Sequence, residues 1–275
     1  MSEKPDPSAP RPKTFSIITV TKNNLDGLKR TQKSVKEQTC RDFEWIIIDG
    51  ASTDGTREHL KTLTVDIPVK ALSEKDDGIY EAMNKGIKRA RGLYLLFLNA
   101  GDTLAAPDTL EKLLKATAKK PDFIYGDALE PDPQTPQKHH YKAASSAKNI
   151  IWGMFTHHQS MLYRRAIIRE DKLRYRHIYT IAGDYEFTAR FLNRAQKSLY
   201  IPMPICIFEQ GGISQKNALE GRRQQYIIRE SLNMASLPVN VGIFALQSLS
   251  FFLRHRAPWL YWGLKNITRA RSKKT

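Results

Sequence analysis

The stretch from Phe15 to Asp102 decides the fold, and it holds three apolar runs: FSIITVT at 15–21, FEWIIID at 43–49 and LYLLFL at 93–98. Runs of this length, rich in β-branched and aromatic residues, are typical of strands buried on both faces of a parallel sheet. The segments between them carry apolar residues at helical spacing. This alternation predicts an α/β fold, with a mixed, mainly parallel sheet flanked by helices.

Polar side chains follow each run at its carboxyl end. Thr21 and Asn23 follow the first run, Asp49 ends the second, and Asn99 and Asp102 follow the third. In open α/β sheets, ligands bind outside the carboxyl ends of the strands. We therefore expect these side chains to point into one crevice.

Two carboxylates in the chain have both a functional and a structural interpretation. Asp49 ends an apolar strand, where a carboxylate is costly unless it meets a partner, so it either binds a ligand or completes a turn. Asp184 lies in the segment Ile181-Ala-Gly-Asp-Tyr-Glu-Phe187 and either does chemistry or caps the helix that follows.

Length and composition suit an ordinary globular protein of 275 residues, with 41% hydrophobic and 26% charged residues. We expect a disordered tail over 1–13, one α/β domain over 14–215 and a helical segment over 216–275. Cys40 and Cys206 are too few for a disulfide framework, which favours buried free thiols and a reducing compartment. There is no secretory segment and no apolar run of about 18–20 residues, so we expect a cytoplasmic protein.

The net charge of +16, from 44 basic and 28 acidic residues, favours anionic partners. No acidic residue follows Leu253, whereas the segment 237–264 is rich in apolar and aromatic residues. This segment either lies on an anionic membrane surface or packs on the domain. No nucleic-acid-binding signature accompanies the charge, so nucleic acid is not expected as a partner.

Five segments in order resemble the inverting, nucleotide-sugar-dependent glycosyltransferases of family 2, over Thr14 to about Ser214. Within the family, the chain is similar to bacterial enzymes for surface polysaccharides and exopolysaccharides, of the colanic-acid type. The resemblance implies the nucleotide-sugar-binding, Rossmann-like fold called the glycosyltransferase A-type fold. The matching segments are Ser16–Asn23, Glu44–Thr56, Ser73–Ile87, Gly92–Asp102 and Ile181–Phe187.

The resemblance also implies roles for particular residues. Asp184 matches the family's general base, with Glu186 as the alternative. Asp102 matches the ligand of a Mn²⁺ or Mg²⁺ cofactor, although Asn99 and Gly101 stand where such motifs usually carry a second carboxylate. The residues expected to bind the donor are Thr21, Asn23, Asp49, Asp77, Asn84 and Asn99. Those expected to meet phosphate or acceptor are His158, Gln159, Gly212, Ser214 and Arg222.

The implied function is metal-assisted transfer of a sugar, such as a hexose, from a nucleotide-diphosphate sugar to a lipid-linked surface glycan. The acceptor would be met on the inner face of the cytoplasmic membrane, to which the enzyme binds peripherally. One alternative is a sugar-nucleotide pyrophosphorylase of similar fold, which should carry a glycine-rich loop after the first strand. The segment Thr21-Lys-Asn-Asn-Leu25 lacks one. The other alternative is a basic, non-catalytic adaptor for nucleic acid or membrane.

Overall fold

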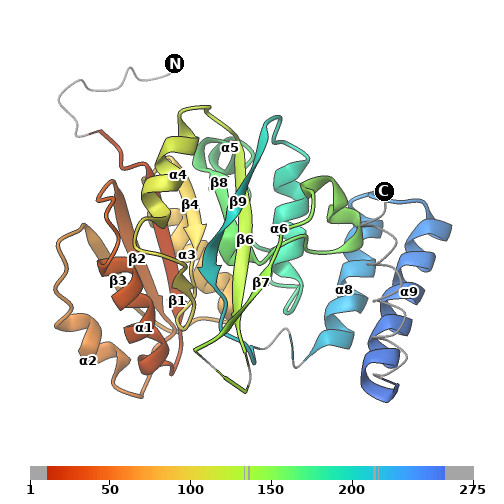
Figure 1. Ribbon diagram of the computed structural model, residues 1–275, viewed down its shortest axis with the longest axis horizontal. Coiled ribbons are helices and arrows are strands. Elements are labelled where there is room, and N and C mark those ends of the chain that lie inside the picture. The colour runs from red at the N-terminus through yellow and green to blue at the C-terminus, as the bar shows by residue number, and fades with distance from the viewer. Residues whose placement is uncertain (1–10, 133, 136, 213–214, 216, 258–275) are drawn as a thin grey trace.

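The computed structural model describes residues 11–132, 134–135, 137–212, 215 and 217–257 (Figure 1). Most of the predicted disordered tail, Ser214 and the chain beyond 257 lie outside the described residues. The described chain forms a twisted mixed sheet flanked by helices, as the sequence predicts (Figure 1). The strand order is β3-β2-β1-β4-β8-β6-β9-β5, and β7 pairs with β6.

The amino-terminal half of the sheet is parallel and closely follows the predicted runs. Thr21 pairs with Asp49, and Asp49 with Ser73, so three strands end at one edge. Every residue of β1 and β2 is buried. The elements of this half are β1 (Phe15–Thr21), α1 (Leu25–Lys36), β2 (Phe43–Asp49), α2 (Thr56–Lys61), β3 (Val69–Ser73), α3 (Ile79–Arg89) and β4 (Tyr94–Phe97).

The second half of the sheet mixes directions. Strand β8 is antiparallel to β4 and β6, whereas β9 is parallel to β6. Its elements are β5 (Thr103–Leu104), α4 (Thr109–Thr117), β6 (Phe123–Pro131), β7 (His139–Lys142), η1 (Ala147–Trp152), η2 (His158–Ser160), β8 (Met161–Arg164), α5 (Arg165–Glu170), α6 (Gly183–Leu192) and β9 (Ser198–Ile207).

Strands β6 and β7 form a hairpin. Strand β6 continues to Pro131, and β7 follows as a strand that the sequence did not suggest. All four residues of β7 are exposed and pair only along β6, so no buried alternation marks them as a strand.

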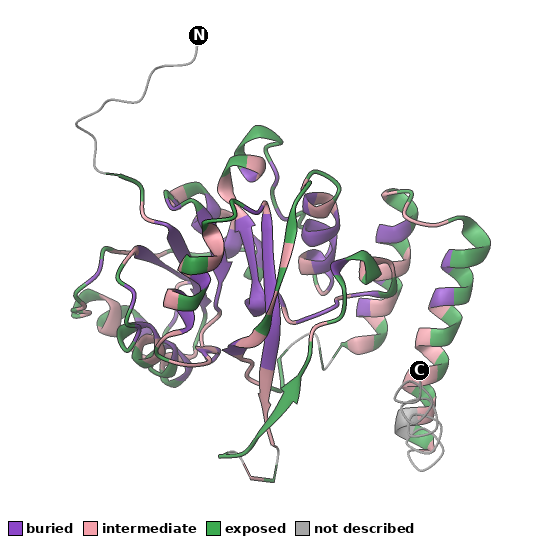
Figure 2. Cartoon of the chain, turned by 45° about the horizontal axis from the view of Figure 1, so that its top comes forward, coloured by how far each residue is buried: buried purple, intermediate pink, exposed green. Residues whose placement is uncertain are grey.

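The sheet has a hydrophobic core on each face, because neighbouring residues of a strand point to opposite faces. Ile18 of β1 lies in one core with residues of α3 and α6, and the adjacent Ile17 lies in the other with residues of α1 and α4. Figure 2 shows these strands as the most buried part of the molecule.

Two carboxyl-terminal helices, α8 (Ala218–Ser231) and α9 (Leu237–Arg256), lie side by side beyond α6 (Figure 1). The buried Arg229 of α8 donates from Nε to Asn240 Oδ1 of α9 at 2.7 Å. Ile228 of α8 packs with Tyr185 of α6 in a third apolar cluster. No helix in the described part of the chain is both long and apolar enough to cross a membrane.

Candidate active site

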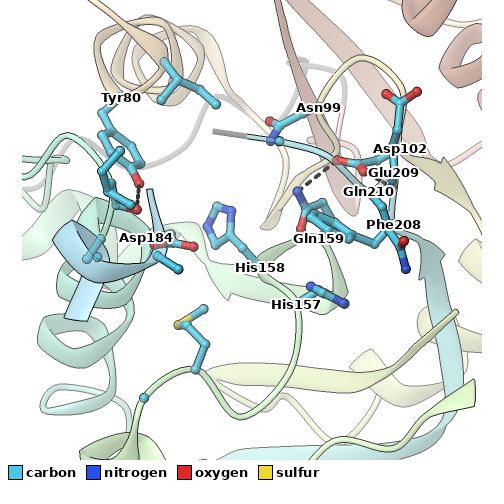
Figure 3. A pocket seen from close by; sticks show the side chains of 18 of the residues that line it. Tyr80, Asn99, Asp102, His157, His158, Gln159, Asp184, Phe208, Glu209 and Gln210 are labelled. Carbon is cyan, nitrogen blue, oxygen red and sulfur yellow. Dashed lines mark hydrogen bonds between the residues drawn. The ribbon is translucent and has the colours of Figure 1, made fainter. Parts of the chain in front are cut away.

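A cavity of about 1090 Å³ opens at the carboxyl ends of β1 and β4 and extends to α8 and α9. Thr21, Asn99 and Asp102 line one end, as expected from the strand ends. Asp184, at the start of α6, also lines it (Figure 3). The cavity therefore brings together Thr21 and Asp184, which are 163 positions apart in the sequence.

Asp102 is held rigidly at the wall of this cavity. Its Oδ2 accepts a hydrogen bond from Gln159 Nε2 at 2.8 Å, and its Oδ1 accepts one from the backbone N–H of Glu209 at 2.9 Å. Burial raises the pKa of Asp102 to about 7, and the nearby Glu209 carboxylate acts in the same direction. Among the causes of this shift there is no positively charged side chain that would stabilise the ionised Asp102 carboxylate.

The turn before Asp102 depends on a glycine. Gly101 has φ +106°, and a Cβ there would lie 1.7 Å from Glu209 Oε2. Glu209 in turn pairs with Arg30 of α1. The loop after β9 is therefore packed directly on the Asn99–Asp102 turn.

At the Asp102 end of the cavity, two buried side-chain oxygens have no hydrogen-bond partner among the described residues: Thr21 Oγ1 and Asn99 Oδ1. Unsatisfied buried polar atoms are rare and costly, and a bound polar ligand is one way to satisfy them. Their position beside Asp102 marks this end of the cavity as a polar binding site.

The same end fits a divalent cation held jointly with a ligand. No group of three or more His, Cys, Asp or Glu side chains poised for a metal occurs among the described residues. Mg²⁺ in particular is commonly held by one or two carboxylates together with substrate phosphates rather than by an all-protein cage. Asp102 and the unsatisfied Asn99 oxygen would supply such a partial set.

Asp184 lies in the first turn of α6, where the backbone N–H of Tyr185 donates to its Oδ1 at 2.8 Å. Burial raises the pKa of Asp184 to about 6, and its interaction with the Tyr80 hydroxyl partly offsets that rise. Tyr80 also accepts the N–H of Gly183 and donates to the carbonyl of Ile181. A carboxylate with this pKa is ionised at neutral pH and can accept a proton.

Glu186 is positioned differently. It is fully buried, and both of its oxygens accept hydrogen bonds from Arg190, at 2.7 and 2.8 Å. Arg176 lies 3.3 Å away as a second cation. Glu186 does not line the cavity, and its lone pairs are engaged by arginines, so its role is structural.

His158 and Gln159 both line the cavity (Figure 3). His158 Nε2 lies 2.8 Å from the Tyr175 hydroxyl, and its ring stacks on Phe97. Burial lowers the pKa of His158 to about 3, so it is neutral at physiological pH. Gln159 holds the Asp102 carboxylate through its hydrogen bond to Oδ2.

Four residues expected to bind the donor lie outside the cavity lining. Asp49 is fully buried and accepts from Ser52 and from Ser73 Oγ, the latter at 2.6 Å. The side chain of Asn84 brackets the backbone N–H and carbonyl of Tyr175. The other two are Asn23, which accepts from Thr53 N–H, and Asp77, which is exposed.

Two of the remaining expected residues also line the cavity. Gly212 and Arg222 line it, and the Arg222 guanidinium lies over the Phe251 ring at 4.6 Å. Ser214 lies outside the described residues.

Sequence reasoning missed Tyr80, Glu209 and the wall formed by Trp152 and Gln247. Tyr80 lies on the buried, apolar face of α3, so the sequence alone does not indicate that its hydroxyl bonds the backbone of Ile181 and Gly183. Glu209 comes from the loop after β9, Trp152 from η1 and Gln247 from α9. No local sequence pattern indicates that these segments pack around one cavity.

Comparisons with known proteins agree on one family. The model named "Glycosyl transferase family 2" matches residues 16–215. A PGL/p-HBAD biosynthesis glycosyltransferase of Mycobacterium tuberculosis is 31% identical over 209 residues, which cover 73% of this chain and 78% of that protein.

Solved structures share the fold at lower identity. S. aureus TarS 1-349 in complex with UDP-GlcNAc has a TM-score of 0.67 at 18% identity, and the match covers 88% of this chain and 74% of that one. The Pyrobaculum calidifontis mannosyltransferase PcManGT, in complex with GDP-Man and Mn²⁺, has a TM-score of 0.62 at 15% identity, with 98% and 84% covered.

Proposed function

Because the chain belongs to glycosyl transferase family 2 and is a glycosyltransferase, we propose that it transfers a sugar, such as a hexose, with inversion from a nucleotide-diphosphate sugar to a hydroxyl of a surface-polysaccharide acceptor. The observation that carries this proposal is that a polar, cation-compatible end and an ionised carboxylate, Asp184, line one cavity. Single displacement needs a diphosphate site and a base in one chamber.

Asp184 performs the proton transfer in this proposal. Its carboxylate accepts the proton of the acceptor hydroxyl as that oxygen forms a bond to the anomeric carbon. The bond from that carbon to the diphosphate oxygen breaks, and the nucleoside diphosphate leaves with the electron pair. The Tyr185 N–H donates to this carboxylate, and the Tyr80 hydroxyl holds the turn before it through the Ile181 carbonyl and the Gly183 N–H.

Asp102 and Asn99 would hold Mn²⁺ or Mg²⁺ together with the donor diphosphate. When bound, such a cation neutralises the charge that develops on the leaving group. Gln159 and the Glu209 N–H orient Asp102 for this contact.

The pyrophosphorylase alternative has less support. After β1, the chain turns at once into α1, and Asn24 caps that helix by accepting the N–H of Gly27. No glycine-rich nucleotidyl loop stands there. A non-catalytic adaptor would have no use for a buried carboxylate and unsatisfied polar oxygens in one cavity.

A thermal-unfolding screen of UDP-, GDP- and dTDP-sugars, with and without Mn²⁺ or Mg²⁺, tests the proposal. A ligand at about 100 times its dissociation constant adds about 2.7 kcal/mol to the free energy of unfolding. We expect sugars of one nucleotide class to stabilise the protein, and to stabilise it more strongly when the cation is present. The Asp184→Asn variant should be stabilised to the same extent, because Asp184 takes part in proton transfer and not in donor binding. A chain that none of these donors stabilises would favour the adaptor.

We also propose that α9 places the enzyme on the inner face of the cytoplasmic membrane, where a lipid-linked acceptor is found. One face of α9 is apolar and exposed along its length, with Val241, Ala245, Leu249 and Phe252 at helical spacing. The sequence that follows is basic and holds no acidic residue. An apolar stripe next to basic residues suits an anionic bilayer surface.

Co-sedimentation with vesicles containing anionic lipid at low salt tests this placement. The double variant Leu249→Ser/Phe252→Ser should lose most of its vesicle binding. Leu93→Ser, which alters a similarly exposed leucine before β4, should bind like the wild type. Equal binding of all three proteins would leave α9 as a packing element.

A further inference from the structure

The end of the cavity opposite Asp102 is built from groups that the chemistry above does not use. Trp152, at the end of η1, lines the cavity, and the residue is 56% exposed. Trp152 also lines a second, smaller cavity of about 230 Å³. Leu246, Gln247 and Ser250 of α9 line the large cavity too.

This wall is a fixed arrangement. Gln247 Nε2 donates to the Trp152 carbonyl at 2.9 Å and to Gln225 Oε1 of α8 at 3.3 Å. Gly153, with φ +118°, lets the chain turn directly after Trp152. Helices α8 and α9 and the end of η1 are thus tied together beside one exposed indole.

The same wall carries an unsatisfied acceptor. Gln247 Oε1 is buried and has no hydrogen-bond partner among the described residues. A buried amide oxygen of this kind would accept a hydrogen bond from a ligand hydroxyl. The unsatisfied Gln247 oxygen and the exposed Trp152 side chain are two independent observations, and both indicate a ligand at the same end of the cavity.

We infer that Trp152, Gln247 and Gln225 form a subsite for a pyranose ring of the acceptor glycan. The apolar C–H face of a sugar ring packs on the electron-rich face of an indole, and neutral amides exchange hydrogen bonds with sugar hydroxyls. A lipid chain would leave the Gln247 oxygen unsatisfied. The exposed apolar face of α9, away from this wall, is the surface suited to lipid.

Helix α8 connects this subsite to the base. Gln224 Oε1 accepts the backbone N–H groups of Ile181 and Ala182, both at 3.0 Å, directly before the turn that carries Asp184. The adjacent Gln225 belongs to the subsite wall. One helix thus sets the position of Asp184 and of the wall that holds the sugar ring. This inference rests on the proposed function, because it names where that reaction's acceptor binds.

Saturation-transfer NMR with millimolar methyl glycosides of glucose, galactose, mannose, rhamnose and N-acetylglucosamine tests the subsite, with UDP, GDP and dTDP binding measured in parallel. We expect saturation transfer to the ring C–H protons of at least one glycoside. Trp152→Ala should weaken that binding by roughly two- to tenfold, and Gln247→Leu by a similar factor. Nucleotide binding should not change in either variant.

Two controls make the result specific. Trp152→Phe keeps an aromatic face and should retain glycoside binding, and Tyr141→Ala removes an exposed aromatic outside the cavity and should behave like the wild type. Nucleotide binding without any glycoside binding, glycoside binding unchanged in Trp152→Ala, or transfer only to the alkyl chain of octyl glycosides would each overturn the subsite. Failure of every nucleotide to bind would instead count against the proposed function.

Discussion

Gln159 Nε2 lies 2.8 Å from Asp102 Oδ2, and this contact joins the segment after η1 to the turn after β4 (Figure 3). The Glu209 N–H approaches the other oxygen of the same carboxylate from the loop after β9. Three segments far apart in sequence thus fix one carboxylate whose pKa burial raises to about 7. This orientation suits the proposed Mn²⁺ or Mg²⁺ site.

The first prediction concerns that cation. Asp102→Ala should abolish the extra stabilisation that Mn²⁺ gives to a bound nucleoside diphosphate, because no other carboxylate of the motif can replace it. Calorimetric titration of UDP, GDP and dTDP with and without Mn²⁺ measures this. Asp108→Ala is the matched control, since Asp108 pairs with Lys112 on the surface of α4. Wild-type turnover that persists in a chelator would rule out the cation role, and basic side chains would then have to neutralise the diphosphate.

The second prediction concerns the base. Asp184→Asn should lower turnover by roughly 10²–10⁴-fold while nucleotide binding survives. In the wild type, turnover should fall about tenfold per pH unit below pH 6, because the pKa of Asp184 is about 6 and only the ionised form accepts a proton. A pH profile of turnover at saturating donor measures this. Near-normal turnover of the variant would reject the assignment.

The raised pKa of Asp184 also affects stability. Since the folded pKa lies above the ordinary value of 3.8, the neutral form contributes stability that is lost as pH rises from about 4 to about 6. Asp184→Asn, which cannot ionise, should therefore be more stable than the wild type at pH 8, by on the order of 1–3 kcal/mol. Denaturant unfolding at pH 4 and pH 8 measures it, and the difference should be small at the lower pH.

The third prediction separates Glu186 from Asp184. Glu186→Gln keeps the shape of the side chain but removes the charge paired with Arg190 and Arg176, so stability should fall by about 1–3 kcal/mol. Turnover per folded molecule should stay within a few-fold of the wild type. Kinetics corrected for the folded fraction would show it, and a loss as deep as that of Asp184→Asn would contradict the structural role.

Strands β1, β2 and β4 could be predicted from sequence because each is an apolar run that is buried at every residue. Phe15–Thr21 and Phe43–Asp49 begin and end as predicted. The end of the cavity at Thr21, Asn99 and Asp102 followed from the rule that ligands bind at strand ends.

What could not be predicted depends on contacts between distant segments. Nothing near Asp49 in sequence indicates that Ser73 of the next strand engages its carboxylate. The wall of Trp152 and Gln247 requires α9 to pack on the end of η1, 95 residues earlier in the sequence. Contacts of this kind produce no recurring pattern of apolar residues in the sequence, whereas a buried strand appears as a continuous apolar run.

The last prediction tests one such hidden contact. Both polar groups of the Asn84 side chain bond the backbone of Tyr175, whose ring stacks on Phe187 and whose hydroxyl meets His158. Asn84→Ala would leave a buried N–H and carbonyl without partners, so the free energy of unfolding should drop by about 1–3 kcal/mol. Donor affinity of the folded protein should stay unchanged, because Asn84 does not line the cavity. Urea unfolding and nucleotide titration, with the exposed Lys88→Ala of the same helix as control, measure the two effects. Weaker nucleotide binding at unchanged stability would restore Asn84 as a donor-binding residue.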